Sequence, residues 1–105
     1  MRVDAKGRLR ASVVDWARRL RVQPSQIRIQ AMTRKWGSCS SGGCVTLSVD
    51  LMNRPTAFQD FVIVHELLHL RIRNHGKLFQ STLRTYLRGN AWATTWQGLA
   101  LEGRT

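Results

Sequence analysis

Apolar residues near the N-terminus recur at helical spacing, and arginines stand between them. The apolar positions fall three or four residues apart: Leu9, Val13, Trp16, Ala17 and Leu20. This spacing predicts an amphipathic helix over about residues 5–21. Pro24 is expected to end it, because proline cannot continue a helix.

The pattern then changes to an alternation of apolar and polar residues, which is typical of strands with one buried face. Ile27, Ile29 and Ala31 alternate with Arg28 and Gln30. After the polar turn Ser-Ser-Gly-Gly, a second alternation predicts a strand over residues 45–51. Its apolar positions are Val45, Leu47, Val49 and Leu51.

Helical spacing returns after Pro55. Thr56 with Gln59 three residues later forms a capping-box pattern, which predicts a helix start near Ala57. Apolar residues surround this helix on nearly all sides: Phe58, Phe61, Val62, Val64, Leu67, Leu68 and Ile72. A further helix ending at Gly89 is predicted from Leu78, Phe79, Leu83, Tyr86 and Leu87. A short aromatic helix is expected around Trp92 and Trp96.

These elements predict an α+β fold in one compact domain spanning residues 1–105. We expect a small sheet of two to three strands, packed on the N-terminal helix and on the helix that starts near Ala57, with helices at the C-terminus. A chain of 105 residues can bury one modest core but not two.

All three histidines of the chain, and one of its two glutamates, lie in one apolar stretch. Residues 62–75 read VIVHELLHLRIRNH. On a helix, His65 and His69 are separated by about 40° and share a face, so both imidazoles can bind one metal ion. Glu66 lies beside that face, where it can reach a water on the metal. A buried, isolated carboxylate is costly, and a divalent cation offsets that cost.

A catalytic zinc usually has three protein ligands, and His75 is the histidine that remains. The chain must turn back to bring His75 near His69. Asn74 and Gly76 are suited to a left-handed helix end. The spacing HExxH-x5-H equals that of the metzincin peptidases, but Ile72 stands where they have glycine and no methionine follows Met52. The expected site therefore holds one Zn²⁺ per chain on His65, His69 and His75. It lacks the glycine and the later methionine of the metzincin pattern.

Two segments also resemble the YgjP-like family of metal-dependent hydrolases, zincin-fold relatives of the SprT-like peptidases. They are RKWGSCSSGGCVTLSVDL, over residues 34–51, and VIVHELLHLRIRNHGKLF, over residues 62–79. The resemblance covers about residues 27–87, and the chain departs from the family pattern at Cys44, Ser48 and Gln80. It implies a zincin-like metallopeptidase with a zinc site at the three histidines and Glu66 as catalytic carboxylate.

The expected reaction is hydrolysis of a peptide or protein substrate, with Glu66 as general base toward a metal-activated water. Tyr86 or an arginine such as Arg34 is a candidate to stabilise the oxyanion. The strand over residues 45–51 is a candidate edge for an extended substrate. Trp36 is expected to pack rather than to contact substrate. A structural zinc site would instead need a fourth ligand, for which Cys39 is the nearby candidate.

Charge adds a second hypothesis about function. The formal net charge is +11, and residues 1–35 contain ten lysines and arginines but two aspartates. This balance favours binding to polyanions, so basic residues 2–35 are candidates for non-specific nucleic-acid binding. In that case the metal site would act on DNA-bound protein or would have a structural role only. A solvated surface is the alternative.

No apolar run predicts a membrane span or a secretion signal, so we expect a cytoplasmic location without membrane contact. In that setting Cys39 and Cys44 are expected as reduced thiols rather than as a disulfide.

Overall fold

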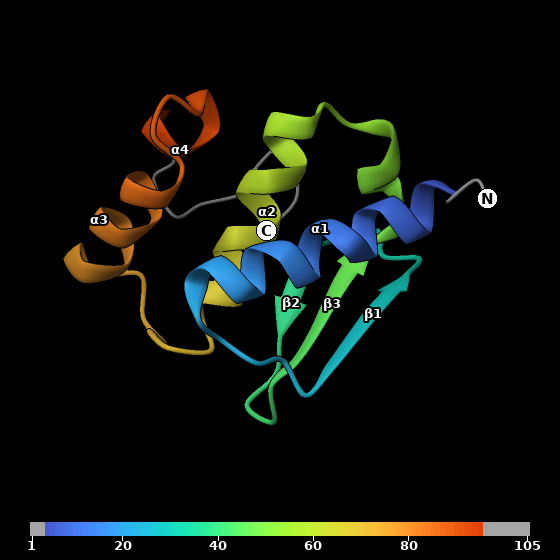
Figure 1. The fold of residues 1–105 in the computed structure, drawn as a ribbon, viewed down its shortest axis with the longest axis horizontal. Coiled ribbons are helices and arrows are strands. Elements are labelled where there is room, and N and C mark those ends of the chain that lie inside the picture. The colour runs from blue at the N-terminus through green and yellow to red at the C-terminus, as the bar shows by residue number, and fades with distance from the viewer. Residues whose placement is uncertain (1–3, 96–105) are drawn as a thin grey trace.

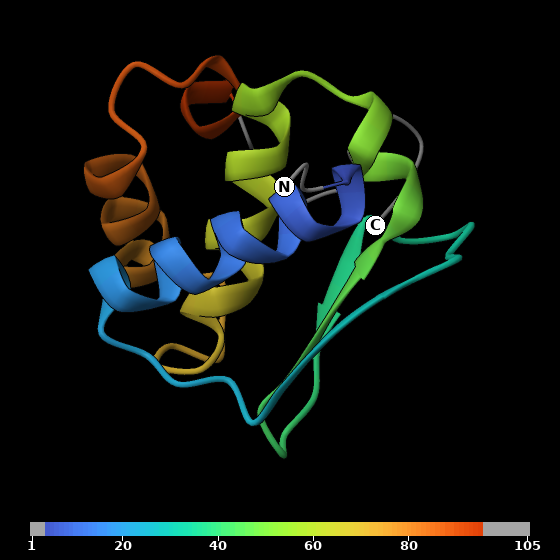
Figure 2. The same cartoon turned by 45° about the vertical axis from the view of Figure 1, so that its right-hand side comes forward.

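The computed structural model describes residues 4–95 and arranges them as an α+β fold (Figure 1). A three-stranded sheet lies along one side, and helices α1 and α2 pack on the same face of it (Figures 1 and 2). The predicted fold class is confirmed. Among the described residues, none of the helices combines the length and the apolar character that a bilayer span needs.

Helix α1 (Ala5–Leu20) forms where the spacing predicts it, and its five predicted apolar positions are buried. The Asp4 carboxylate caps its first turn by accepting a hydrogen bond of 2.7 Å from the Gly7 amide. Arg21 ends the helix in the left-handed conformation, with φ of 57°. The amide of Val22 then bonds to the Ala17 carbonyl, which closes the helix three residues before Pro24.

The sheet has the order β1–β3–β2, so β3 is its central strand. Strand β1 (Gln26–Gln30) pairs in parallel with β3 (Cys44–Ser48). Strand β2 (Gly37–Cys39) pairs antiparallel with β3, through the hairpin turn that follows Cys39. The sequence pattern did not predict β2, because three residues are too few to show an alternation.

The predicted strand over residues 45–51 is correct only in its first half. Strand β3 ends at Ser48, and Val49–Asn53 form the 3₁₀ helix η1. The Ser48 hydroxyl accepts a hydrogen bond from the Asp50 amide and donates one to the Met32 carbonyl. This local capping competes with the strand ladder, while Leu51 stays buried in the core.

Helix α2 (Thr56–Leu68) starts where expected, but the capping box is absent. Pro55 is the N-cap residue, and no side chain caps the helix start. The Gln59 amide group instead donates to the carbonyls of Leu51 and Arg54, at 2.8 and 3.1 Å. Gln59 thereby ties η1 to the start of α2 rather than closing the helix end.

Apolar side chains surround α2 and form the centre of the core. Trp36 is 8% exposed, and its ring meets that of Phe58 edge-on at 5.1 Å, which confirms a packing role for this tryptophan. The remaining helices are α3 (Lys77–Tyr86) and α4 (Ala91–Thr95). Trp92 of α4 packs edge-on against Phe58, whereas the predicted helical position Trp96 lies outside the described residues.

Candidate metal centre

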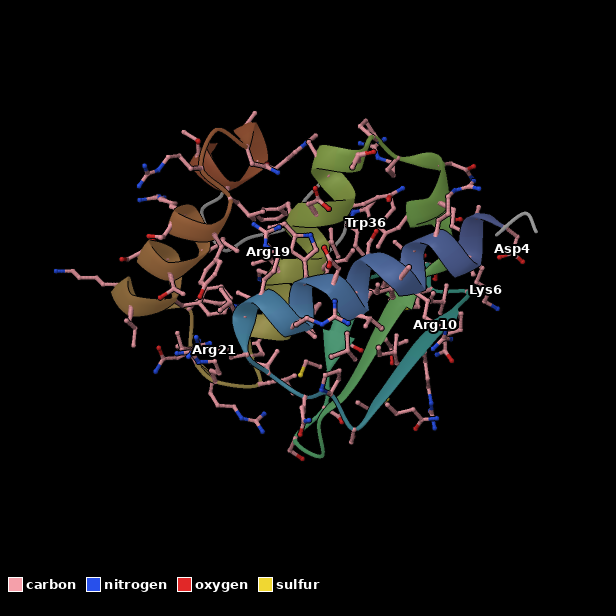
Figure 3. The ribbon with its side chains drawn as sticks, in the orientation of Figure 1. Asp4, Lys6, Arg10, Arg19, Arg21 and Trp36 are labelled. Carbon is pink, nitrogen blue, oxygen red and sulfur yellow. The ribbon has the colours of Figure 1, made fainter. Side chains whose placement is uncertain are left out.

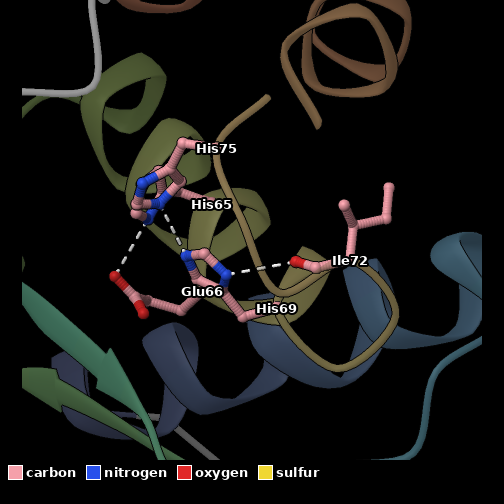
Figure 4. A network of polar contacts seen from close by, with 5 residues as sticks. All are labelled: His65, Glu66, His69, Ile72 and His75. Carbon is pink, nitrogen blue, oxygen red and sulfur yellow. Dashed lines mark hydrogen bonds and ion pairs between the residues drawn. The ribbon is translucent and has the colours of Figure 1, made fainter. Parts of the chain in front are cut away.

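Two of the three histidines come from the C-terminal end of α2. His65 lies in its last turn, and His69 is the C-cap residue. Glu66 stands between them with 7% of its surface exposed, and its Oε2 atom lies 3.0 Å from His65 Nδ1. The carboxylate therefore points toward the histidines (Figure 4).

His75 joins them because the chain reverses after α2. The amides of Leu70 and Arg71 bond to the carbonyls of Leu67 and Leu68, which tightens the helix end. Asn74 was expected in the left-handed conformation, but among the described non-glycine residues only Arg21 has a positive φ. Gly76 also has a negative φ, of −74°. The reversal therefore comes from the tightened turn, and the Asn74 side chain accepts a bond from the Gly76 amide.

The three imidazoles converge on one point. One nitrogen from each ring of His65, His69 and His75 lies within 4.8 Å of the others, and Nε2 of His69 and His75 are 2.8 Å apart (Figure 4). Nδ1 of His69 lies 3.2 Å from the Ile72 carbonyl. A proton on Nδ1 would leave Nε2 as a lone-pair donor toward a metal, the usual arrangement for a histidine ligand.

Apolar and polar neighbours hold this cluster in place. The buried ring of Phe79, on α3, stacks on His69 at 4.8 Å and meets the rings of His65 and His75 edge-on. Gln80, a position that departs from the family pattern, donates 3.1 Å to the His75 carbonyl. The sequence pattern placed Phe79 in a predicted helix, and the resembling segment ended at it, but neither indicated its contact with the histidines.

Burial also favours the neutral imidazoles that bind metals. Desolvation lowers the pKa of His69, and the neighbouring His65 lowers it further, while Glu66 opposes the change. Desolvation likewise lowers the pKa of His75, with His65 and His69 contributing. A donor set of three neutral histidines suits a divalent ion such as zinc and leaves one coordination position open. Within residues 4–95 this group includes no fourth protein ligand, so Cys39 does not close it.

His65 and His69 line a cleft of about 380 Å³ between α2, the loop after it and strand β2. Its lining residues are Lys35, Gly37, Ser38, Cys39, His65, Glu66, His69 and Arg73. Neither Tyr86 nor Arg34 is among them, and the basic residues that line the cleft are Lys35 and Arg73. Cys39 and Cys44 are both free thiols, as expected.

Strand β2 forms the sheet wall of this cleft. Strand 45–51 was expected as an edge for substrate, but β3 is central and pairs on both sides. Gly37 of β2 lies against the glutamate: a Cβ atom there would stand 2.9 Å from Glu66 Cγ and 3.1 Å from Leu47 Cδ2. Because Gly37 has no side chain, the Glu66 side chain can lie directly against its backbone. The Trp-Gly-Ser-Cys motif marked this segment, but not that contact.

Three histidines converging on one point, a glutamate beside them and an open cleft are the features of a metal-dependent hydrolase. The chain belongs to the YgjP-like family, because the model of the YgjP-like metallopeptidase domain matches residues 1–97. It is therefore a metallopeptidase domain with a three-histidine group able to hold a metal.

Solved structures show the same fold. The metallopeptidase zymogen of Methanocaldococcus jannaschii jannalysin is similar, with a TM-score of 0.68 and 27% identity over 81% of this chain and 83% of that one. The metallopeptidase zymogen of Pyrococcus abyssi abylysin has a TM-score of 0.66 and 20% identity over 77% and 81% of the two chains. A comparison with curated proteins found no match.

Proposed function

We propose that this chain is a zinc-dependent peptidase in which His65, His69 and His75 hold one zinc ion and Glu66 is the general base. The observation that carries the proposal is the convergence of the three imidazoles beside a buried carboxylate, at the wall of an open cleft. The metallopeptidase neighbours support the same class of reaction.

When bound, zinc supplies a Lewis acid that lowers the pKa of a coordinated water to about 7 and polarises a carbonyl group. The chain's own residues transfer the proton and surround the metal site. Glu66 Oε2, which lies at hydrogen-bonding distance from the histidine cluster, accepts the proton of the attacking water. The same oxygen then returns that proton to the leaving amine. The buried ring of Phe79 packs against all three imidazoles and shields that side of the cluster from bulk water.

The substrate is held in extended form along β2. This strand pairs with β3 on one side, and Gly37, Ser38 and Cys39 all line the cleft on its other side. An extended peptide added to that edge places its backbone carbonyls next to Glu66, and main-chain hydrogen bonds supply binding without regard to sequence.

Substitution of Glu66 by Gln tests the proposed function. This variant keeps the shape of the side chain but has no base, so kcat should fall by about 10²- to 10⁴-fold while the metal stays bound. Activity on an unstructured protein and metal content by mass spectrometry are the measurements. Asp60→Asn is the matched control, because Asp60 lies on the same helix and accepts a bond from Trp16 away from the cleft. Loss of metal in Glu66→Gln would contradict the role of a base.

A second candidate function, non-specific nucleic-acid binding, is favoured by the exposed basic residues of α1. Figure 3 shows Lys6, Arg10 and Arg19 along this helix, with Arg21 at its C-terminal end. Basic residues exposed on a helix suit contacts with phosphates that position a protein without reading sequence. Binding of this kind would bring the cleft to protein that is itself bound to nucleic acid.

A further inference from the structure

The charges that line the cleft are unevenly distributed. Lys35 and Arg73 line it with exposed side chains, whereas Glu66 is the one carboxylate among the lining residues. Glu66 is buried and contacts His65. Within residues 4–95, neither Lys35 nor Arg73 forms an ion pair with a carboxylate. Both residues therefore contribute positive charge to the lining of the cleft without a carboxylate partner.

The position of Arg73 is set by the fold. It lies in the loop after α2, and its guanidinium donates a hydrogen bond of 3.3 Å to the Ser41 carbonyl in the turn between β2 and β3. Its charge also reaches Cys39: burial and Glu66 raise the pKa of that thiol, and Arg73 acts against them. Arg73 therefore stands near the end of the cleft that is formed by the C-terminal end of β2.

Lys35 stands at the opposite end of β2. It precedes the first residue of that strand, Gly37, by two positions, whereas Ser41 follows the last residue, Cys39, by two. A strand of three residues spans about 10 Å. The two cations thus lie beyond opposite ends of the edge strand, and both line the cleft that Glu66, His65 and His69 also line.

We propose that Lys35 and Arg73 each recognise a carboxylate, one at each end of the cleft. The enzyme would therefore select peptides with an acidic group on one or the other side of the bond to be cleaved. The proposal rests on the proposed peptidase function and names its substrate class. The carboxylate can come from an aspartate or glutamate side chain or from the C-terminus of the peptide. Guanidinium and ammonium groups both bind carboxylates by charge-assisted hydrogen bonds.

The expected preference is moderate because the site is open to water. An exposed ion pair contributes little, so the two cations together should favour an acidic peptide over its neutral isostere by roughly three- to tenfold. The preference should weaken with added salt, since exposed charges are screened. A lysine in place of the acidic residue should weaken binding below the neutral peptide.

Binding to the Glu66→Gln protein tests this proposal without turnover. The probes are labelled peptides of one neutral sequence with an amidated C-terminus, in which glutamate, glutamine or lysine stands on one or the other side of the centre. A neutral peptide with a free C-terminus reports recognition of the terminal carboxylate. Fluorescence anisotropy gives each affinity, and cleavage by the native enzyme gives kcat/KM for the same set.

Variants locate the effect. Lys35→Met and Arg73→Met should each reduce the preference for glutamate on one side of the centre, and the double variant should abolish it. Arg84→Met and Arg88→Met are matched controls, because each removes one exposed positive charge outside the cleft. A preference for the free C-terminus, lost in the double variant, would identify the terminal carboxylate as the ligand.

Two results would overturn the proposal: equal binding of glutamate and glutamine peptides, or an equal loss of preference in the control variants. Its failure is separable from failure of the proposed function. Cleavage without charge preference would reject the carboxylate site alone. A charge preference in binding without any cleavage by the native enzyme would reject the peptidase function alone.

Discussion

The outer side of α1 and the cleft beside α2 both carry ionisable side chains, but they hold them differently. On α1 the arginines are spread out, and several have local partners. Arg18 lies 3.7 Å from Asp15, Arg19 stacks over Trp16 at 3.8 Å, and Arg10 donates to the Ile27 carbonyl. Beside the cleft, one nitrogen from each of three histidines lies within 4.8 Å of the others, and Glu66 lies 3.0 Å from His65.

The comparison indicates that the clustering of ionisable side chains in space matters more for chemistry than their number. An exposed ion pair such as Arg18–Asp15, with side chains 75% and 66% exposed, contributes little because water screens it. A buried carboxylate beside three imidazoles is costly unless a cation or proton compensates it. The cleft should therefore respond strongly to single substitutions, and α1 only weakly.

The largest effect is expected from the loss of one histidine. His75→Ala removes one of three proposed ligands, so metal affinity should fall by more than about a hundredfold. This loss is larger than the usual effect of removing a residue that only orients a ligand. Activity and thermal stability should fall with it, since binding free energy contributes to folding. Metal titration and a melting curve measure both. Lys77→Ala is the control, because Lys77 is an exposed neighbour. Full metal retention in His75→Ala would show that His75 is not a ligand.

A smaller effect is expected from displacing the glutamate without removing it. Gly37→Ala places a methyl group 2.9 Å from Glu66 Cγ, so the carboxylate must shift. A misplacement of this order should lower kcat/KM by about ten- to a hundredfold with the metal retained. Gly42→Ala in the same hairpin is the control, because the nearest atom to its Cβ is 3.9 Å away. Equal activity of the two variants would show that Glu66 tolerates the shift.

The metal-free protein should lose stability in mild acid. The folded pKa values of His69 and His75 lie below their ordinary value, mainly through desolvation, so the unfolded chain binds more protons as the pH falls. Their contribution to stability is therefore complete above about pH 6.5 and is lost as the pH falls through the folded pKa values. Urea unfolding at pH 7.5 and 5.5 measures this loss. His75→Gln should reduce it, and an unchanged pH dependence would contradict the role of His75.

The smallest effect is expected on α1. Wild-type protein should bind short DNA weakly, with an affinity that falls steeply with salt as counterions are released. Arg18→Glu with Arg19→Glu should weaken this binding without changing metal content or activity, because both residues are exposed and lie outside the cleft. Titrations with single- and double-stranded DNA at two salt concentrations test it. Equal, negligible binding by both proteins would leave α1 as a solvated surface.

Sequence patterns were most informative where the contacts are local. His65, Glu66 and His69 lie within five residues on one helix, so helical geometry alone predicts that they share a site. The buried face of α1 follows from its spacing in the same way. Local patterns failed where a second contact competed with them. The alternation over residues 45–51 continued past Ser48, but the hydroxyl of that residue started η1 instead.

The local sequence thus predicted the candidate metal site: three histidines at a given spacing and the glutamate that stands among them. The surroundings of that site depend on the tertiary structure. That structure placed β3 in the centre of the sheet and β2 at the edge, set Gly37 against Glu66, and brought Arg73 to the hairpin turn. These contacts join residues that are far apart in the chain, and their distances depend on how the whole core packs rather than on any local periodicity.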